Sequence, residues 1–431
     1  MTHEPGRRFF RAMRDAPAGP PAPTAAKDDS APVTPGTWAA RAAAVIPGGA
    51  STGSKRPFAL YGRDEPAAPT HFVRASGYRV LTADGRELAD FTSALGSVAL
   101  GYADPEVTRA VCDAVAAGTV SGLASTLEVE VAERLCEVVP CAERVRFLKS
   151  GAEGVAAAVR LARAATGRDL VLGSGYFGWL DWWSDAPGVP QGVRADFRAL
   201  PFDEPDALTA AADAAGRRLA AIVLEPVQER LPSPAWMRAA RAACDRHGAV
   251  LVLDEVKTGF RLHAGGYQAY ADVRPDVAVV GKALANGFPL AAVLGRADVM
   301  EEARRSWISS TLAGETAALA AARAVLDRHA REDVCGRLWR TGEAQMAVAR
   351  EALVASGTDA ALLGIPPMWF LRHADAARET RVLERLAGLG VLLKRGAYDF
   401  PTLAHDDAGL ALLGRALAEA LGAETLREDA S

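Results

Sequence analysis

The chain has 431 residues, a formal charge of −4, and hydrophobic residues at half of its positions. This length exceeds one ordinary core, so two domains are expected, and the small charge gives no long-range attraction to nucleic acid or anionic lipid. The five cysteines include no C-x-x-C pair, and no apolar run approaches the ~20 residues that span a bilayer. We therefore expect a cytoplasmic protein without a disulfide framework or a metal site.

The N-terminal region divides into two parts. Residues 1–35 are rich in proline, alanine and charge, which predicts a disordered tail, and no apolar core follows the first arginines as it would in a signal peptide. Residues 36–95 are expected to form the N-terminal part of a small domain. They hold a short helix from Thr37 and a hairpin that turns at Asp84-Gly85.

Residues 96–320 alternate short apolar strands with amphipathic helices, which predicts an α/β domain whose mostly parallel sheet is wrapped by helices. The expected strands are 145–148, 169–172, 220–224, 249–253 and 276–280. The expected helices are 105–117, 127–138, 153–166, 205–215 and 234–247.

Residues 321–431 are expected to form a smaller α+β domain together with the N-terminal segment. This C-terminal part is expected to open with a long helix at 316–329, followed by a helix at 378–389, a strand at 391–393 and a closing helix at 408–421.

Three predicted strand ends carry polar residues, at the edge where open parallel sheets bind their ligands. The first strand runs into Ser150-Gly151-Ala152-Glu153 and a helix. Free amides and the positive helix end suit a phosphate, although the same residues form an ordinary helix cap. At the second end, Asp254 and Glu255 follow a buried strand. Buried carboxylates at this position need a cationic partner or a metal ion, and a magnesium site would show the same pattern.

The third strand end carries Lys282 between Gly281 and Gly287. Burial there would lower the pKa of the amine and make it a nucleophile, whereas a lysine in solvent at the sheet edge is the ordinary alternative. The three ends together suit pyridoxal 5′-phosphate (PLP). The helix start can bind its phosphate, and the lysine can react with its aldehyde. The carboxylate can pair with its protonated ring nitrogen.

The motifs around these residues resemble the class III (ω-type) aminotransferases of PLP fold type I, in the branch close to glutamate-1-semialdehyde 2,1-aminomutase. The resemblance covers residues 37–330 well and the C-terminal region more loosely. The motifs that carry it are 46–49, 84–85, 147–153, 160–169, 224–227, 254–261, 281–287 and 311–314.

The resemblance implies a role for each matching residue. Lys282 holds PLP as a Schiff base and moves the proton, and Asp254 pairs with the ring nitrogen. Val256 and Tyr176 pack on the two ring faces, and Glu225 lines the pocket.

For the phosphate, the resemblance implies a cradle of Ser150, Gly151 and Ala152. It also implies that Thr311 reaches the phosphate of a neighbouring subunit, so a homodimer with shared active sites is expected.

The chain departs from these relatives at several positions. Ala152 replaces a threonine, and the lost hydrogen bond to a charged group is worth ~1.5–3 kcal/mol. Phe177 stands where relatives usually carry histidine. Lys257 occupies a position that faces the phenolic oxygen of PLP in some relatives, and it either stabilises that oxygen or turns to solvent. The family's substrate-binding arginine maps onto either Lys55 or Arg56.

Further substrate contacts are open. Trp179 could line the substrate pocket with Trp182 and Trp183, or this aromatic cluster could belong to the core. Lys394 and Arg395 could bind an anionic substrate or form a solvated basic pair.

One motif points elsewhere. Gly173 to Gly178 fits a dinucleotide fingerprint, but no helix pattern follows it and no carboxylate closes a second strand at the required distance.

The leading hypothesis is a PLP-dependent transfer of an amino group from a donor, with L-glutamate as a candidate, to the carbonyl of a small metabolite. A keto-sugar or another intermediate of secondary metabolism is the expected acceptor. An aminomutase that keeps both steps on one molecule is the second hypothesis, and a non-catalytic scaffold of the same fold is the third.

Overall fold

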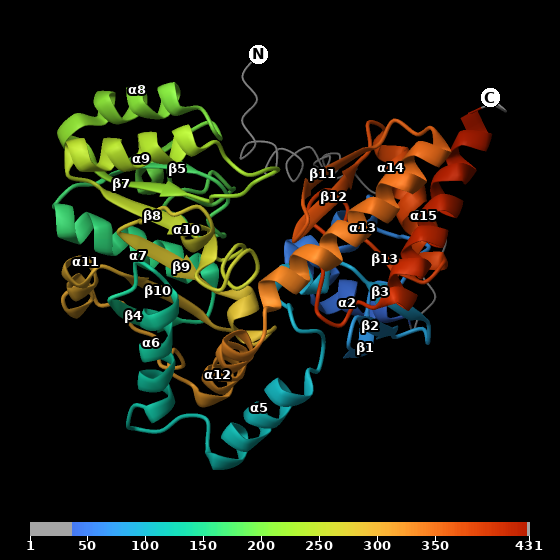
Figure 1. The fold of residues 1–431 in the computed structure, drawn as a ribbon, viewed down its shortest axis with the longest axis horizontal. Coiled ribbons are helices and arrows are strands. Elements are labelled where there is room, and N and C mark those ends of the chain that lie inside the picture. The colour runs from blue at the N-terminus through green and yellow to red at the C-terminus, as the bar shows by residue number, and fades with distance from the viewer. Residues whose placement is uncertain (1–36, 429–431) are drawn as a thin grey trace, which may run out of the picture. The chain divides into compact units, whose positions relative to one another are not determined.

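The computed structural model describes residues 37–428, so the predicted tail lies outside the described residues. The described chain forms two compact units, Gly96–Arg340 and a second unit built from residues 37–95 and 341–428 (Figure 1). No described helix has both the length and the apolar content that a membrane span requires.

The first unit contains a seven-stranded sheet of order β4-β10-β9-β8-β7-β5-β6. Only β10 runs antiparallel to its neighbours. Every strand predicted for this region is present, whereas β6 and β10 were not predicted. The strands are β4 (Arg144–Leu148), β5 (Leu170–Ser174), β6 (Phe197–Ala199), β7 (Leu219–Leu224), β8 (Val250–Asp254), β9 (Val277–Val280) and β10 (Ala291–Gly295). The predicted α/β fold with a mostly parallel sheet is confirmed.

Helices pack against this sheet, with α7 against strands β7 to β10 and α9 against β7 and β8 (Figure 1). All helices predicted between residues 105 and 329 are present, but the helix predicted to open the C-terminal part at 316–329 belongs to this first unit. The helices of this unit are α5 (Pro105–Ala117), α6 (Thr126–Val138), α7 (Gly151–Thr166), α8 (Pro205–Ala215), α9 (Pro234–His247), α10 (Gly266–Tyr270), α11 (Ala297–Glu301) and α12 (Thr316–Arg331). Short α4 (Ser93–Gly96) precedes them.

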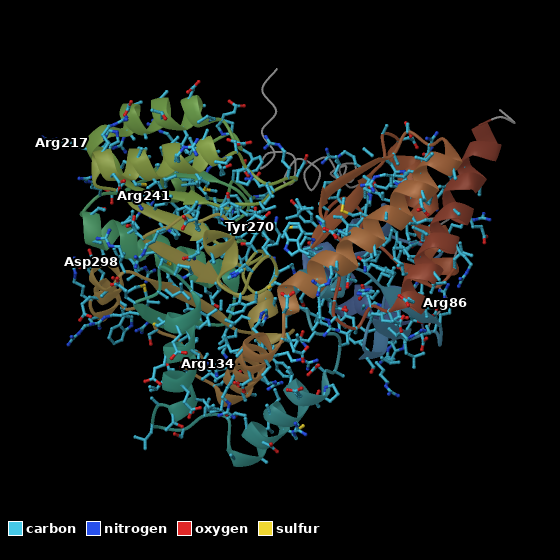
Figure 2. All side chains as sticks on the ribbon, in the orientation of Figure 1. Arg86, Arg134, Arg217, Arg241, Tyr270 and Asp298 are labelled. Atoms are coloured by element: carbon cyan, nitrogen blue, oxygen red, sulfur yellow. The ribbon has the colours of Figure 1, made fainter. Side chains whose placement is uncertain are left out.

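Charged residues at the amino edge of the sheet are structural. Buried Asp276 precedes β9 and pairs with Arg241 at 2.9 Å and with Arg296 at 2.7 Å. Arg296 follows β10, and it reaches this edge because β10 runs antiparallel to β9. Figure 2 labels Arg241 and Asp298, a second partner of Arg296. These groups fix strand ends opposite the edge at which the ligand was predicted.

The second unit joins N- and C-terminal segments in one sheet of order β1-β2-β3-β13, because β13 pairs in parallel with β3. This confirms the predicted smaller α+β part. Its strands are β1 (Phe72–Ser76), β2 (Arg79–Thr82), β3 (Glu87–Asp90), β11 (Ala361–Ile365), β12 (Met368–Arg372) and β13 (Val391–Leu392). Its helices are α2 (Trp38–Val45), α3 (Pro57–Tyr61), α14 (Ala376–Gly388) and α15 (Asp407–Glu428), while α13 (Val334–Ser356) contains the boundary between the units.

Candidate active site

Four side chains follow four neighbouring strands at the carboxyl edge of the large sheet. Lys282 follows β9, Asp254 ends β8, Glu225 follows β7, and Tyr176 lies two residues after β5. Adjacent strands lie ~4.8 Å apart, so these side chains are brought together. Glu225 and Lys282 both perturb the carboxyl group of Asp254, which places them in one electrostatic cluster.

Asp254 is a buried carboxylate, with 5% of its surface exposed. One oxygen accepts the backbone N–H of Val256 at 3.0 Å. Burial, helped by the Glu225 carboxylate, raises the pKa of Asp254 to about 7. A cation placed beside Asp254 would favour its ionised form, so the site is suited to a protonated ring nitrogen.

Glu255 has a different environment from Asp254, because successive strand residues point to opposite faces. Its carboxylate accepts the Thr258 hydroxyl and the Tyr267 N–H at 2.6 Å each, and the Gln268 N–H at 3.0 Å. Glu255 is therefore a structural residue and does not share a magnesium site with Asp254. Within residues 37–428 no group of three His, Cys, Asp or Glu residues could hold a metal ion.

Lys282 begins a tight turn at the end of β9. Its φ of +47° lies in the left-handed region, which costs a non-glycine residue ~1–3 kcal/mol and therefore requires a fixed surrounding. Asn286 provides part of that surrounding, since its side chain accepts the N–H groups of Ala99 and Leu100 at 2.9 Å. Burial, with the neighbouring Lys257, lowers the pKa of Lys282. The side chain is half-buried, so it is not a fully solvated lysine at the sheet edge.

The start of α7 meets the strand ends through Val256. A Cβ atom on Gly151 would lie 2.8 Å from both γ-methyl groups of Val256, and one on Gly281 would lie 3.6 Å from its Cγ1. Val256 therefore borders both the helix start and the backbone beside Lys282. The Ser150 hydroxyl forms a capping box with Glu153. The cap interpretation thus holds for that side chain, and the first backbone N–H groups of the helix, which have no carbonyl partner within it, are suited to an anion.

An aromatic loop follows β5 and borders the same site. The N–H of Tyr176 donates to Glu225 at 3.1 Å, and a Cβ on Gly178 would lie 2.2 Å from that of Ala152. Phe177, Trp182 and Trp183 are buried, so they belong to the core.

Trp179 differs from its aromatic neighbours, because 74% of its surface is exposed. No helix follows Gly178 as a dinucleotide fold would require, which agrees with our rejection of the fingerprint.

Lys257 does not turn to solvent. Its side chain is 8% exposed, and its ammonium nitrogen lies 2.6 Å from a carboxylate oxygen of Glu225, whose side chain is 13% exposed. The ion pair connects the loop after β8 with the residue after β7. The sequence did not predict this pairing, since the two residues are 32 positions apart with no pattern linking them.

Other predicted substrate residues lie in the second unit. Lys55 and Arg56 are exposed. Arg395 pairs with Glu379 at 2.9 Å, and buried Lys394 donates to the carbonyl oxygen of Ala59 at 2.7 Å. The solvated basic pair expected at 394–395 is therefore wrong, because the ammonium group of one residue is buried among carbonyl oxygens and the other residue is ion-paired.

Thr311, the residue predicted to reach a neighbouring subunit, lies exposed in the turn before α12.

Two contributors to the geometry were not singled out from the sequence. Fully buried Arg261 donates to the carbonyl oxygens of Gly96 and Val98. Asn286 adds a bond to Gly101 at 3.0 Å. Arg261 fixes the segment before α5 against the loop after β8, and Asn286 fixes it against the lysine turn. Asn286 followed by Gly287 was a local signal, because asparagine tolerates the left-handed conformation that it adopts here at φ +44°.

The donor set fits PLP. The site combines a buried carboxylate that a cation would stabilise, a lysine of lowered pKa, and the open N-terminus of α7. The sheet and this set of groups define a fold type I PLP enzyme. The profile of the family Aminotransferase class-III matches residues 60–173 and 197–359. The chain therefore belongs to the class III aminotransferases, and its cofactor is PLP.

Known proteins agree with this assignment. The chain is 38% identical to the 2'-deamino-2'-hydroxyneamine transaminase of Streptomyces kanamyceticus, over 78% of this chain and 86% of that protein. It is 36% identical to a glutamate-1-semialdehyde 2,1-aminomutase of Sorangium cellulosum, over 73% and 75%. The PLP-bound FumI protein of Sphingopyxis has a similar structure, with a TM-score of 0.86 and 27% identity over 91% of this chain and 97% of that one.

Proposed function

We propose that this enzyme transfers an amino group from an amino donor, with L-glutamate as the candidate, to the carbonyl of a small hydroxylated metabolite such as a keto-sugar. The observation that carries the proposal is the cluster of Lys282, Asp254 and the start of α7 around Val256. PLP bound there supplies an electron-withdrawing ring that stabilises negative charge on the carbon that bears the amino group.

Each residue of the cluster has a role in this proposal. Lys282 links to PLP and carries the proton to and from the reacting carbon. Asp254 keeps the ring nitrogen protonated, and the amides of Gly151 and Ala152 bind the phosphate. Val256 and Tyr176 hold the two ring faces. The burial of Asp254 and the lowered pKa of Lys282 support the roles of those two groups.

The proposed acceptor class is supported by the relative from Streptomyces kanamyceticus, whose name specifies a hydroxylated amine. The site offers polar groups on Glu225 and Lys257, and Trp179 exposes an aromatic surface on the neighbouring loop. Such polar groups can form hydrogen bonds with the hydroxyl groups of a substrate. Lys55, Arg56 and Arg395 stay candidates for binding the carboxylate of a donor.

Aminomutase activity is the second candidate, because the chain is also 36% identical to an aminomutase. The two activities differ in whether the product of the first half-reaction leaves the enzyme. Incubation of the PLP form with L-glutamate alone separates them. A transaminase is expected to release 2-oxoglutarate and leave the pyridoxamine form. The absence of conversion with L-glutamate and every other common donor would favour the aminomutase.

We also propose that two chains form a dimer with shared sites, in which Thr311 of one subunit binds the phosphate at the other. Exposed Thr311 lies near exposed Trp307 and Leu312, the kind of surface that a second copy would cover.

A further inference from the structure

The Lys257–Glu225 ion pair is a feature of this site to which the proposed proton transfer at Lys282 gives no role. The two charged groups are 2.6 Å apart, and both side chains are almost fully buried. The second oxygen of Glu225 accepts the N–H of Tyr176 at 3.1 Å. The pair thus spans the ends of β7 and β8 and fixes the backbone of the residue proposed to cover the PLP ring.

Removing one member of such a pair is costly, because the remaining buried charge has neither water nor an opposite charge to stabilise it. The ion pair therefore holds the Lys257 and Glu225 side chains in one place. Two opposite charges are held beside the amine that is to be linked to PLP.

Four charged groups act on Lys282. Two are the members of the pair, and the others are Asp254 and buried Arg261. Tyr176 in turn faces Glu225 and Asp254. Lys257 lowers the pKa of the Lys282 amine, whereas Glu225 raises it. The nitrogen of the link between Lys282 and PLP would experience the same two opposing fields, because it occupies the end of the same side chain.

We propose that the Lys257–Glu225 pair sets the pH at which the link between Lys282 and PLP gains its proton, and that it does so through two opposing charges held at fixed positions. The inference rests on the proposed role of Lys282. Lys257 and Glu225 are positioning residues in this account.

The test is a pH titration of the visible absorbance of the PLP-loaded enzyme without substrate. In Lys257→Met the nearby cation is lost, so the midpoint is expected to move to higher pH by about one unit. In Glu225→Gln the nearby anion is lost, so the midpoint should move to lower pH. The double variant should titrate close to the parent, because both fields are removed together.

Lys257→Arg is the matched control, because it keeps the charge and should keep the midpoint of the parent enzyme. A purely structural role would move both single variants in the same direction, and that result would overturn the inference, as would midpoints that do not move. Each single variant tests the predicted direction of its own midpoint shift. If one variant misfolds, the other still tests the inference.

Lys282→Ala separates failure of this inference from failure of the proposed function. If the PLP-link absorbance persists in that variant, the role of Lys282 is wrong. If it disappears while the charge variants titrate like the parent, only the inference about the ion pair fails.

Discussion

Asp254 and Glu255 show how neighbouring residues of the same type acquire different functions. The Glu255 carboxylate is surrounded by hydrogen-bond donors from Thr258, Tyr267 and Gln268. Asp254 is buried with the single backbone donor of Val256. Because strand residues alternate between faces, the Glu255 carboxylate holds the fold, whereas Asp254 lies on the face with Glu225 and Lys282 and is proposed to pair with the cofactor.

The environment of Asp254 predicts an unusual stability profile for the PLP-free protein. Its pKa of about 7 lies above that of unfolded aspartate, ~3.9. The folded state therefore retains a proton that the unfolded chain loses, and stability falls as pH rises from about 4 to 7. Asparagine does not ionise, so this pH-dependent loss of stability is absent in Asp254→Asn. At pH 8 the PLP-free variant is expected to be more stable than the parent by up to ~4 kcal/mol, and at pH 4 the two should be equal.

Denaturant unfolding at both pH values checks this prediction, and Glu255→Gln is the matched control. Burial raises the pKa of Glu255 as well, so Glu255→Gln also removes a charge that burial disfavours at pH 8. The two variants differ at pH 4, where the loss of one acceptor oxygen for the N–H groups of Tyr267 and Gln268 should cost Glu255→Gln ~1–3 kcal/mol. An Asp254→Asn variant that is less stable than the parent at pH 8 would show that burial does not disfavour the ionised Asp254 carboxylate. With PLP present the order should reverse, because the ring nitrogen loses its anionic partner.

At the scale of elements, the site depends on how the loop after β5 fits against the start of α7. Gly178 lies directly on Ala152 at a φ of +85°. The residue that replaces the family's threonine thus lies in contact with the loop that carries Tyr176.

Gly178→Ala is expected to displace this loop, because its Cβ would lie 2.2 Å from the Cβ and 2.7 Å from the Cα of Ala152. We expect a loss of stability of ~1–3 kcal/mol and faster release of PLP. Gly188→Ala is the matched control. Gly188 has a φ of +92° but no atom within 4 Å of an added Cβ, so it reports the backbone strain alone. PLP retention is measured after gel filtration. Equal retention by the two variants would show that the close contact between Gly178 and Ala152 does not affect cofactor binding.

The sequence predicts those elements that combine a clear pattern with a clear boundary. Strands β7 and β8 are buried apolar runs, and α5, α8 and α9 begin at prolines and end at or just before Gly118, Gly216 and Gly248. Strand β6 has three residues and no alternation, and β10 follows the lysine turn as a short run of small residues. Helix α13 carries two internal glycines, Gly336 and Gly342, which weaken its pattern.

The same limit applies within the site. Lys282 and Asp254 follow recognisable strands, so their positions could be predicted. The pairing of Lys257 with Glu225 depends on which strands become neighbours, and a local pattern does not contain that information.

At the scale of the whole molecule, every group of the proposed PLP site except the contribution from a second chain lies in Gly96–Arg340. The proposed contribution of Thr311 can be tested with hybrid dimers. Lys282→Ala and Thr311→Glu should each abolish activity, the second because it places an anion against the phosphate. In a hybrid of the two, one site carries both changes and the other carries neither.

Such a hybrid is expected to recover about half of the activity of the parent dimer, because one of its two sites is intact. Affinity-tagged subunits mixed after reversible dissociation provide the sample, and each variant mixed with itself is the control. An inactive hybrid would show that Thr311 serves the site of its own chain.

Besides Lys282, the cluster contains a second lysine that could compete for PLP. Lys257 is engaged by Glu225 at 2.6 Å, whereas Lys282 has a lowered pKa. Borohydride reduction of the PLP-loaded enzyme fixes the cofactor to the lysine that holds it, and peptide mass mapping then identifies that lysine. We expect the label on Lys282 and none on Lys257. A label on Lys257, or on any lysine outside the cluster, would show that Lys282 does not hold the cofactor.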